Sequence, residues 1–176
     1  MKFISTKIEN VFIIEPEKKG DDRGWFMRTF DLDLFKENIP SFDCNWVQIN
    51  QSYNKNKYTW RGFHYQMYPF EETKIVRCIS GSVLDCVLDL REYSKTYLQT
   101  LQIELSSFNN TMLYIPKGCA HGYLTLEENC ELIYFHDEYY NPAFESGVKF
   151  DDKKISFTLP FTPKIISDKD CNYSDL

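Results

Sequence analysis

The chain has 176 residues, which suffices for one domain with a sizeable apolar core, and aromatic residues make up 16% of it, a share that favours strands. Its net charge of -6 argues against nucleic acid or an anionic membrane as the main partner, although a local group of cations can still bind a small anion. With no secretion signal and no apolar run close to the roughly 18 residues of a membrane span, we expect a cytoplasmic protein.

The first predicted element in chain order is a helix, and the rest of the pattern is β. Residues 31–38 begin with Asp31, carry apolar residues on one side and precede Pro40, so they predict a short helix. Strand-like runs follow at 74–79, 82–90, 97–105, 112–116 and 131–136, with turn residues between them. Short strands at this spacing are typical of a sandwich or barrel of the jelly-roll type. No repeat or linker divides the chain, so we expect one domain over residues 1–176, irregular after Pro160.

The cysteines predict a reducing compartment. Zinc sites and redox pairs usually have closely spaced cysteines, but here no CxxC pair occurs, so we interpret the cysteines as free thiols. The six are Cys44, Cys78, Cys86, Cys119, Cys130 and Cys171. Cys78 and Cys86 fall in strand-like runs, where a small buried apolar residue is the simpler interpretation.

The spacing of the histidines argues against a metal centre. Metal-binding barrels of this type place two histidines one residue apart on a strand, with a carboxylate nearby. Here the residue two positions after His64 is Gln66, an amide and a weak ligand. His121 alone keeps the character of the second motif, and the third histidine is His136. We therefore expect no metal at the site.

His64 is the candidate for a proton-abstracting base. The ordinary pKa of an imidazole, about 6.5, suits it to general-base catalysis near neutral pH. Arg61 precedes it on the same run, Lys74 and Arg77 follow on the next, and Arg23 lies in a Gly- and Asp-rich turn flanked by aromatic residues. Cations among aromatic residues in an acidic protein indicate a site for a phosphorylated ligand that carries a flat base.

Further motifs occur along the chain in a fixed order. They are Gly20-Asp21-Asp22-Arg23-Gly24 with Phe26, Val47-Gln48-Ile49-Asn50-Gln51-Ser52, Arg61-Gly62-Phe63-His64-Tyr65-Gln66, Lys74-Ile75-Val76-Arg77, Asp89-Leu90-Arg91, Pro116-Lys117-Gly118-Cys119-Ala120-His121-Gly122, Tyr134, Tyr139-Tyr140-Asn141-Pro142 with Glu145, and Ser167-Asp168-Lys169-Asp170. With them the chain resembles the dTDP-4-dehydrorhamnose 3,5-epimerases, which act on dTDP-4-keto-6-deoxyglucose, from about residue 7 to residue 170. The resemblance implies an all-β, cupin-type jelly-roll barrel with a few short helices. It also implies a nucleotide-diphosphate sugar as substrate, no cofactor, and a homodimer with exchanged N-terminal strands.

The resemblance further implies a role for each matching residue. His64 matches the proton acceptor, Tyr134 the proton donor and Asp170 the carboxylate that pairs with the histidine. The implied substrate contacts are Arg23 and Arg61 near the diphosphate, Lys169, the sugar or nucleotide contacts Gln48, Asn50, Lys74, His121 and Glu145, and Tyr140 stacked on the thymine ring. In the implied reaction, a ketone at carbon 4 acidifies the hydrogens at carbons 3 and 5. His64 removes a proton, Lys74 stabilises the oxyanion with His121 as a second candidate, and Tyr134 returns a proton from the opposite face.

Departures from the family pattern leave the exact substrate open. Arg28 stands where the family often carries Glu as a nucleotide contact, so we count it as a substrate contact of altered charge. The usual Trp-Pro near the end is Leu159-Pro160, and residues 136–138 are unusually charged. The alternatives are inversion at carbon 3 only, at carbon 5 only or at both, and a shift of the keto group between carbons 3 and 4. A GDP or CDP carrier and a sugar-binding cupin without catalysis also remain open.

Overall fold

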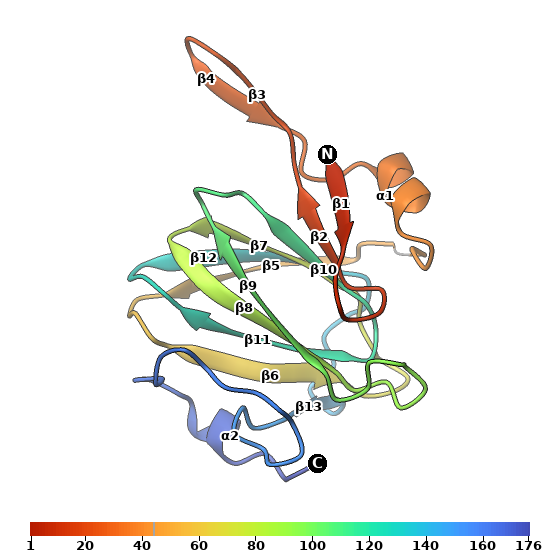
Figure 1. Cartoon of the computed structure of the whole chain (residues 1–176), viewed down its shortest axis with the longest axis vertical. Helices are drawn as coiled ribbons and strands as arrows, with labels where there is room; N and C mark the ends of the chain where they lie inside the picture. The colour runs from red at the N-terminus through yellow and green to blue at the C-terminus, as the bar shows by residue number, and fades with distance from the viewer. Residues whose placement is uncertain (44) are drawn as a thin grey trace.

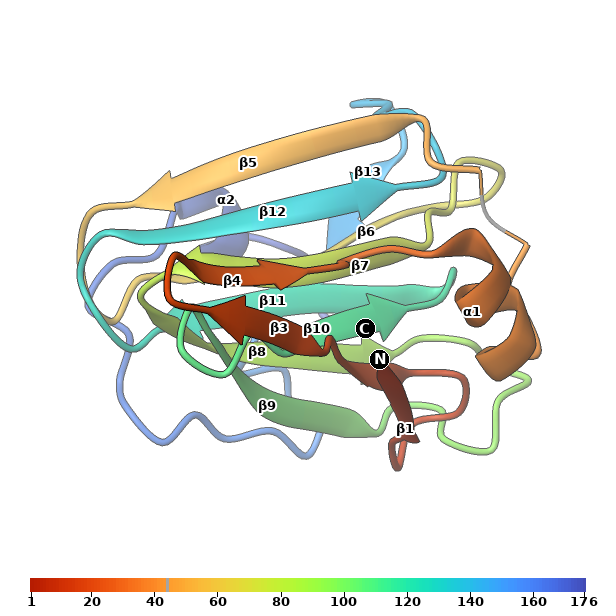
Figure 2. The ribbon, with the colours of Figure 1, turned by 90° about the horizontal axis from the view of Figure 1, so that it is seen from above.

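Two antiparallel sheets face each other in the computed structural model, which describes residues 1–43 and 45–176 (Figure 1). The six-stranded sheet has the order β1 (Lys2–Ser5), β2 (Phe12–Glu15), β10 (Met112–Ile115), β7 (Lys74–Ser80), β12 (Cys130–His136), β5 (Gln48–Asn54). The five-stranded sheet has the order β13 (Glu145–Gly147), β6 (Trp60–Gln66), β11 (Cys119–Thr125), β8 (Ser82–Asp89), β9 (Thr100–Ser106). The two layers are visible from above in Figure 2. The all-β jelly-roll prediction is confirmed.

A third, two-stranded element stands apart from the barrel. β3 (Lys18–Asp21) and β4 (Gly24–Met27) pair only with each other and project from the body of the molecule (Figure 1). The helices are α1 (Leu32–Asn38) and α2 (Asp168–Cys171). The side chain of Asp31 accepts a hydrogen bond from the backbone N–H of Leu34, so the helix predicted over 31–38 is confirmed with Asp31 as its N-cap.

Two expectations differ from the structure by more than one residue at the end of an element. The strand expected over 97–105 begins only at Thr100, because Leu98 has a φ of 61° and the N–H of Gln99 donates to Thr96 in a turn. The segment after Pro160 was expected to be irregular, yet it contains α2, which Ser167 caps. Cys44 lies outside the described residues, and the other cysteines are free thiols.

The core between the sheets follows from strict alternation along the strands. Apolar side chains from β7, β8, β10, β11 and β12 point inward at every second position and form one cluster. The same inward rows also carry polar residues, within the cluster on β8 and β11 and beyond it where β7 begins and β12 ends. These residues are Lys74, Asp85, His121, Tyr134 and His136, and we call this set the polar end. The alternation that builds the core therefore also gathers the polar groups.

Two glycines let β6 and β11 approach closely beside His64. A Cβ added to Gly62 would lie 2.3 Å from Cα of Gly122, and Gly62 has a φ of +135°, which disfavours any side chain. The pairing of β6 with β11 shifts register at this point, between His121 and Tyr123. His64 and His121 are register partners next to this shift, so the glycine contact fixes how the two histidines lie relative to each other.

The last part of the chain packs against the five-stranded sheet. Val148, Ile155, Phe157 and Ile166 cover side chains such as Trp60 in a second apolar cluster. This segment carries α2 to the side of β6, as Figure 1 shows. A carboxylate near the C-terminal end is thereby brought next to a strand from the middle of the chain.

Candidate active site

His64 and Asp170 form a hydrogen-bonded pair at β6. The Nε2 atom of His64 lies 2.7 Å from Oδ1 of Asp170, and the N–H of Gly62 donates to Oδ2 at 3.3 Å. Burial by itself would raise the pKa of Asp170, but the hydrogen bond and the charge of His64 lower it below its usual range. Asp170 is therefore ionised at neutral pH. It fixes the orientation of the imidazole and leaves the other ring nitrogen free to accept a proton.

Tyr134 lies on the facing sheet. Its hydroxyl is 2.9 Å from Oγ of Ser52, and its ring centroid is 6.2 Å from that of His121. Burial, together with the neighbouring Tyr123, raises the pKa of Tyr134 well above its ordinary value. The hydroxyl is therefore protonated and available as a donor. His121 is also the register partner of His64, so the base and the tyrosine lie on the two facing sheets, each beside the same histidine.

A cavity of about 90 Å³ opens between the two sheets at this point. The residues that line it come from β5, β6, β12, β13 and the loops beside them, and they are Gln48, Asn50, His64, Tyr65, Gln66, Glu72, His136, Tyr140 and Glu145. The structure thus brings together Gln48, Asn50, His64, Tyr140 and Glu145, which the sequence had placed in one site. The Tyr140 hydroxyl donates to Glu145 at 2.7 Å, which joins the loop after β12 to β13 at this cavity.

A second cavity, of about 340 Å³, lies on the other side of His64. Arg61, Lys169 and Asp170 line it together with His64. Lys169 is also ion-paired with Glu145 at 2.5 Å, so it connects the two cavities. The expected diphosphate contact Arg61 and the expected contact Lys169 therefore meet at His64, and their charges favour an anionic ligand there.

Lys74 and His121 are each paired with a carboxylate. Lys74 is 4% exposed, and its Nζ lies 2.7 Å from Oε1 of Glu72. Nε2 of His121 lies 2.9 Å from Oδ2 of Asp85. Burial raises the pKa of Asp85, and the neighbouring His121 only partly opposes this effect. Both expected contacts thus belong to the polar end, where the low exposure strengthens electrostatic interactions.

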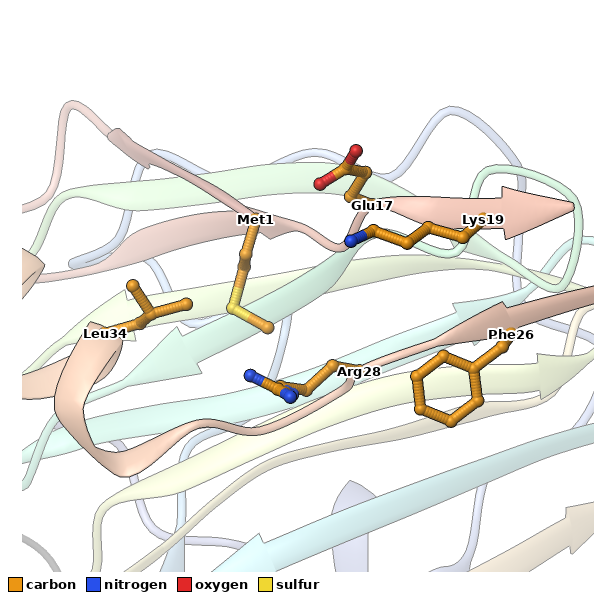
Figure 3. A pocket seen from close by; sticks show the side chains of 6 residues that line it. All are labelled: Met1, Glu17, Lys19, Phe26, Arg28 and Leu34. Atoms are coloured by element: carbon orange, nitrogen blue, oxygen red, sulfur yellow. The ribbon is translucent and has the colours of Figure 1, made fainter.

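Arg23 and Arg28 do not join the other site residues within one chain. Arg23 lies in the turn between β3 and β4, where its exposed side chain pairs with Asp21 at 2.6 Å. Arg28 pairs with Asp31 at 2.6 Å. It lines a separate cavity of about 170 Å³ beside Phe26 at the base of the hairpin (Figure 3). In the single chain, the hairpin carries these two arginines away from His64.

The sequence reasoning did not assign five residues that line the smaller cavity or contact His64, namely Tyr65, Gln66, Glu72, His136 and Tyr173. Glu72 and His136 line the cavity and form a hydrogen bond of 2.7 Å. The charged 136–138 segment and the two-residue spacing from Tyr134 to His136, which puts both on one strand face, were the available signals. Tyr173 packs its ring edge-on against His64 at 6.1 Å, and its buried hydroxyl has no hydrogen-bond partner among the described residues. No sequence signal pointed to Tyr173.

Within residues 1–43 and 45–176, no group of three or more His, Cys, Asp or Glu side chains is arranged to hold a metal ion. Across the same residues, no helix has the length and apolar character needed to cross a membrane.

Comparisons with known proteins agree with this geometry. Residues 5–176 match the family model for dTDP-4-dehydrorhamnose 3,5-epimerase. The enzyme of that name from Shigella flexneri is 37% identical over 98% of this chain and 94% of its own length. A dTDP-4-dehydrorhamnose 3-epimerase from Streptomyces niveus is 31% identical over 93% of this chain and 78% of its own length.

Solved structures of similar proteins contain ligands. The Bacillus anthracis dTDP-4-dehydrorhamnose 3,5-epimerase, with TDP and PPi bound, has a TM-score of 0.94 at 35% identity, and the match covers 99% of each chain. A Legionella pneumophila dTDP-6-deoxy-D-glucose-3,5-epimerase in complex with dTDP-4-keto-L-rhamnose has a TM-score of 0.90 at 32% identity, over 97% of this chain and 89% of that one. The jelly-roll barrel and these likenesses define an isomerase of the cupin type. The chain belongs to the dTDP-4-dehydrorhamnose 3,5-epimerase family.

Proposed function

We propose that the chain converts dTDP-4-dehydro-6-deoxy-D-glucose to dTDP-4-dehydro-L-rhamnose by inverting carbons 3 and 5. Family membership supports this reaction, and so do the ligands in the two similar structures. The observation that carries the proposal is the pair formed by His64 and the ionised Asp170, with the protonated Tyr134 on the facing sheet. Abstraction from one face and return from the other face require this arrangement.

In the proposed reaction, the free ring nitrogen of His64 takes the proton from the carbon beside the ketone. The electron pair moves to the carbonyl oxygen, and Asp170 stabilises the imidazolium that forms. Lys74, with His121 nearby, opposes the charge of the enolate oxygen. Tyr134 then donates its proton to the opposite face of the carbon, which inverts that centre, and solvent restores both groups. The same cycle at the second carbon completes the conversion.

Incorporation of solvent deuterium tests the proposal. In heavy water, the chain should introduce deuterium at carbons 3 and 5 of dTDP-4-dehydro-6-deoxy-D-glucose, as read by NMR and mass spectrometry. His64→Ala should abolish the exchange at both positions. Binding of the nucleotide sugar without any exchange in the wild-type chain would instead identify a sugar-binding cupin.

Inversion at carbon 3 alone is the second candidate, because the Streptomyces niveus relative is named as a 3-epimerase. Deuterium at carbon 3 and none at carbon 5 would establish it.

The nucleotide that carries the sugar is a separate question, because the positive charge of Arg28 lies beside Phe26. Offering the same sugar on dTDP, GDP and CDP tests the carrier, and we expect the highest kcat/KM for dTDP.

We also propose a homodimer in which each chain supplies its β3–β4 hairpin to the active site of the other chain. We place the protein in the cytoplasm, where a reducing environment keeps its thiols free. The hairpin exposes Trp25 (56%) and Phe26 (70%) beside Arg23. The outer face of β5 exposes Ile49 and Tyr53. Exposed aromatic residues of this kind are typical of protein interfaces, and a second chain would bring Arg23 to the His64 cavity.

Mixing two inactive variants tests the exchange of hairpins. His64→Ala and Arg23→Ala chains lack different halves of the proposed composite site, so each alone should be nearly inactive. After mixing and subunit exchange, half of the dimers are mixed and each holds one intact site, which restores about a quarter of wild-type activity. Absence of recovery in a sample that light scattering shows to be a mixed dimer, or a monomeric wild type, would overturn this proposal.

A further inference from the structure

Glu72 joins two residues of the polar end. Its Oε1 lies 2.7 Å from Nζ of Lys74, and its Oε2 lies 2.7 Å from Nδ1 of His136. Lys74 and His136 are register partners on β7 and β12, so the ladder between the strands holds the two donors side by side. One carboxylate therefore binds an ammonium group and an imidazole at the same time.

Little water reaches this group. The side chains of Lys74, Glu72 and His136 are 5%, 12% and 12% exposed. Burial alone would raise the pKa of Glu72, but the charge of Lys74 and the hydrogen bond from His136 lower it to about 2. The carboxylate is thus charged at neutral pH. A buried ammonium without such a counter-ion shifts towards its neutral form.

The group faces the reacting centre. Glu72 and His136 line the cavity that contains His64, and the ring of His136 is 6.1 Å from that of Tyr134. The charge of Lys74 acts across the barrel on Asp85. The other titratable side chains around the group are Cys119 and His121 on the facing sheet, Tyr134 on β12, and His64, Tyr65, Tyr140 and Glu145 at the cavity. Asp137 also lies beside it, accepts a hydrogen bond from the N–H of Thr73 and is ion-paired with Lys117.

We propose that Glu72 and His136 are a positioning pair that keeps the ammonium of Lys74 charged and directed into the barrel, and thereby sets the upper pH limit of epimerisation. This inference rests on the proposed function, since the charge is needed to stabilise an enolate oxygen. His136 holds one oxygen of Glu72, so the other stays on Lys74 instead of rotating away. Neither residue needs to touch the substrate for this role.

The pH dependence of deuterium incorporation in Glu72→Gln tests the pair. Without the carboxylate, Lys74 loses its counter-ion, so the alkaline limb of kcat should move down by about one pH unit or more. At pH 8, kcat should fall about tenfold or more while KM changes less than about threefold, because stabilisation of the transition state and not substrate binding is lost. An alkaline limb that stays in place would overturn the inference.

Matched variants separate positioning from general damage. His136→Gln keeps an N–H donor for Glu72 and should stay within about threefold of wild type, whereas His136→Phe removes the donor and should lower kcat further. Glu131→Gln is the matched control. It removes a surface carboxylate on β12, the strand that also carries His136, where Glu131 accepts a hydrogen bond from Gln51, and it should change neither kcat nor KM. An equal loss in Glu131→Gln, or equal activity of the two His136 variants, would count against the pair.

A second variant, Glu72→Asp, and the NMR signal of the Lys74 ammonium also test the pair. If Glu72→Gln does not fold, Glu72→Asp is the alternative, since it keeps the negative charge but one methylene farther from Lys74. For this variant kcat should fall while the alkaline limb stays in place. A displaced alkaline limb would contradict the positioning role of Glu72. If wild type shows no exchange at all, the proposed function fails, yet the pair can still be tested. The ammonium NMR signal of Lys74, assigned with Lys74→Arg, should be present at pH 8 in wild type and His136→Gln. It should also be present in Glu72→Asp, which keeps the counter-ion, and be lost in Glu72→Gln, so its persistence in Glu72→Gln would overturn the inference.

Discussion

Asp170 keeps its charge at a position that is only 4% exposed. Its two oxygens accept hydrogen bonds from His64 and from the N–H of Gly62, and its own N–H donates to the hydroxyl of Ser167. Each of these contacts stabilises the carboxylate or holds it in place, which offsets the cost of burial. The residue thus serves as an ionised partner to the histidine and not as a proton donor.

Asp170→Asn should lower the rate of deuterium incorporation by about a hundredfold or more. The amide has nearly the same shape, but it does not stabilise the imidazolium and favours the wrong tautomer of His64. The single-turnover rate of exchange measures the effect, and the near-ultraviolet circular dichroism should match that of wild type. A rate within threefold of wild type would show that the pair with His64 has no part in the chemistry.

Tyr173→Phe should leave the free energy of unfolding unchanged or raise it by up to about 1 kcal/mol. The hydroxyl is buried without a partner among the described residues, so its removal relieves a desolvation cost while the ring keeps its contact with His64. Denaturant titration at pH 7 measures the difference. A loss of stability greater than 1 kcal/mol would mean that the hydroxyl has a partner in solution.

At the scale of elements, β6 and β11 depend on a contact that only glycine permits. Gly62→Ala should destabilise the chain by about 3 kcal/mol or more, because the new methyl group would meet the backbone of Gly122 at 2.3 Å. Gly24→Ala is the matched control, since Gly24 has a similar φ of +133° with nothing within 4 Å of the added Cβ. It should cost only the backbone strain, about 1 to 3 kcal/mol, so equal losses in the two variants would refute the steric explanation.

The sequence predicted the elements whose signals are local. The helix at 31–38 has its cap and its apolar side within eight residues, and the strand-like runs predicted β7, β8, β9, β10 and β12, five of the eleven strands that the described residues form in the two sheets. Leu98 was placed in a strand because its left-handed φ leaves no trace in an apolar residue type. α2 was missed because a helix of four residues is too short for a periodic pattern.

The site was predictable as far as the family motifs reached. The motif positions predicted His64, Tyr134 and Asp170 as site residues. The structure adds the hydrogen bond of 2.7 Å between His64 and Asp170. The bond between Glu72 and His136 spans 64 positions and depends on the register of β7 with β12. One sequence alone does not reveal such a register, because any shift by two residues preserves the same apolar pattern.

At the scale of the whole molecule, carboxylates with lowered pKa values make stability depend on acid. Glu72 falls from an ordinary 4.5 to about 2, and the pKa of Asp89 is also lowered, because hydrogen bonds from Arg91, Ser94 and Thr96 outweigh the effect of burial. For each carboxylate, the unfolded chain binds a proton more readily than the folded chain at any pH between the folded and the unfolded pKa. The resulting stabilisation is fully present above about pH 4.5 and is lost as the pH falls through the folded pKa.

The free energy of unfolding should therefore decrease steeply between pH 4.5 and pH 2. Glu72 alone should account for a loss on the order of 3 kcal/mol. Denaturant titrations at several pH values measure the slope, which should be shallower for Glu72→Gln because that side chain no longer titrates. The same slope in wild type and variant would show that Glu72 is not the group responsible.

The long separation between His64 and Asp170, 106 positions along the chain, has a consequence for synthesis. A ribosome delivers all the strands of both sheets before the segment that carries α2 emerges. A barrel at that stage holds its histidine without the carboxylate that orients it. The chain therefore acquires the oriented histidine that moves protons only when the segment that carries α2 docks against β6.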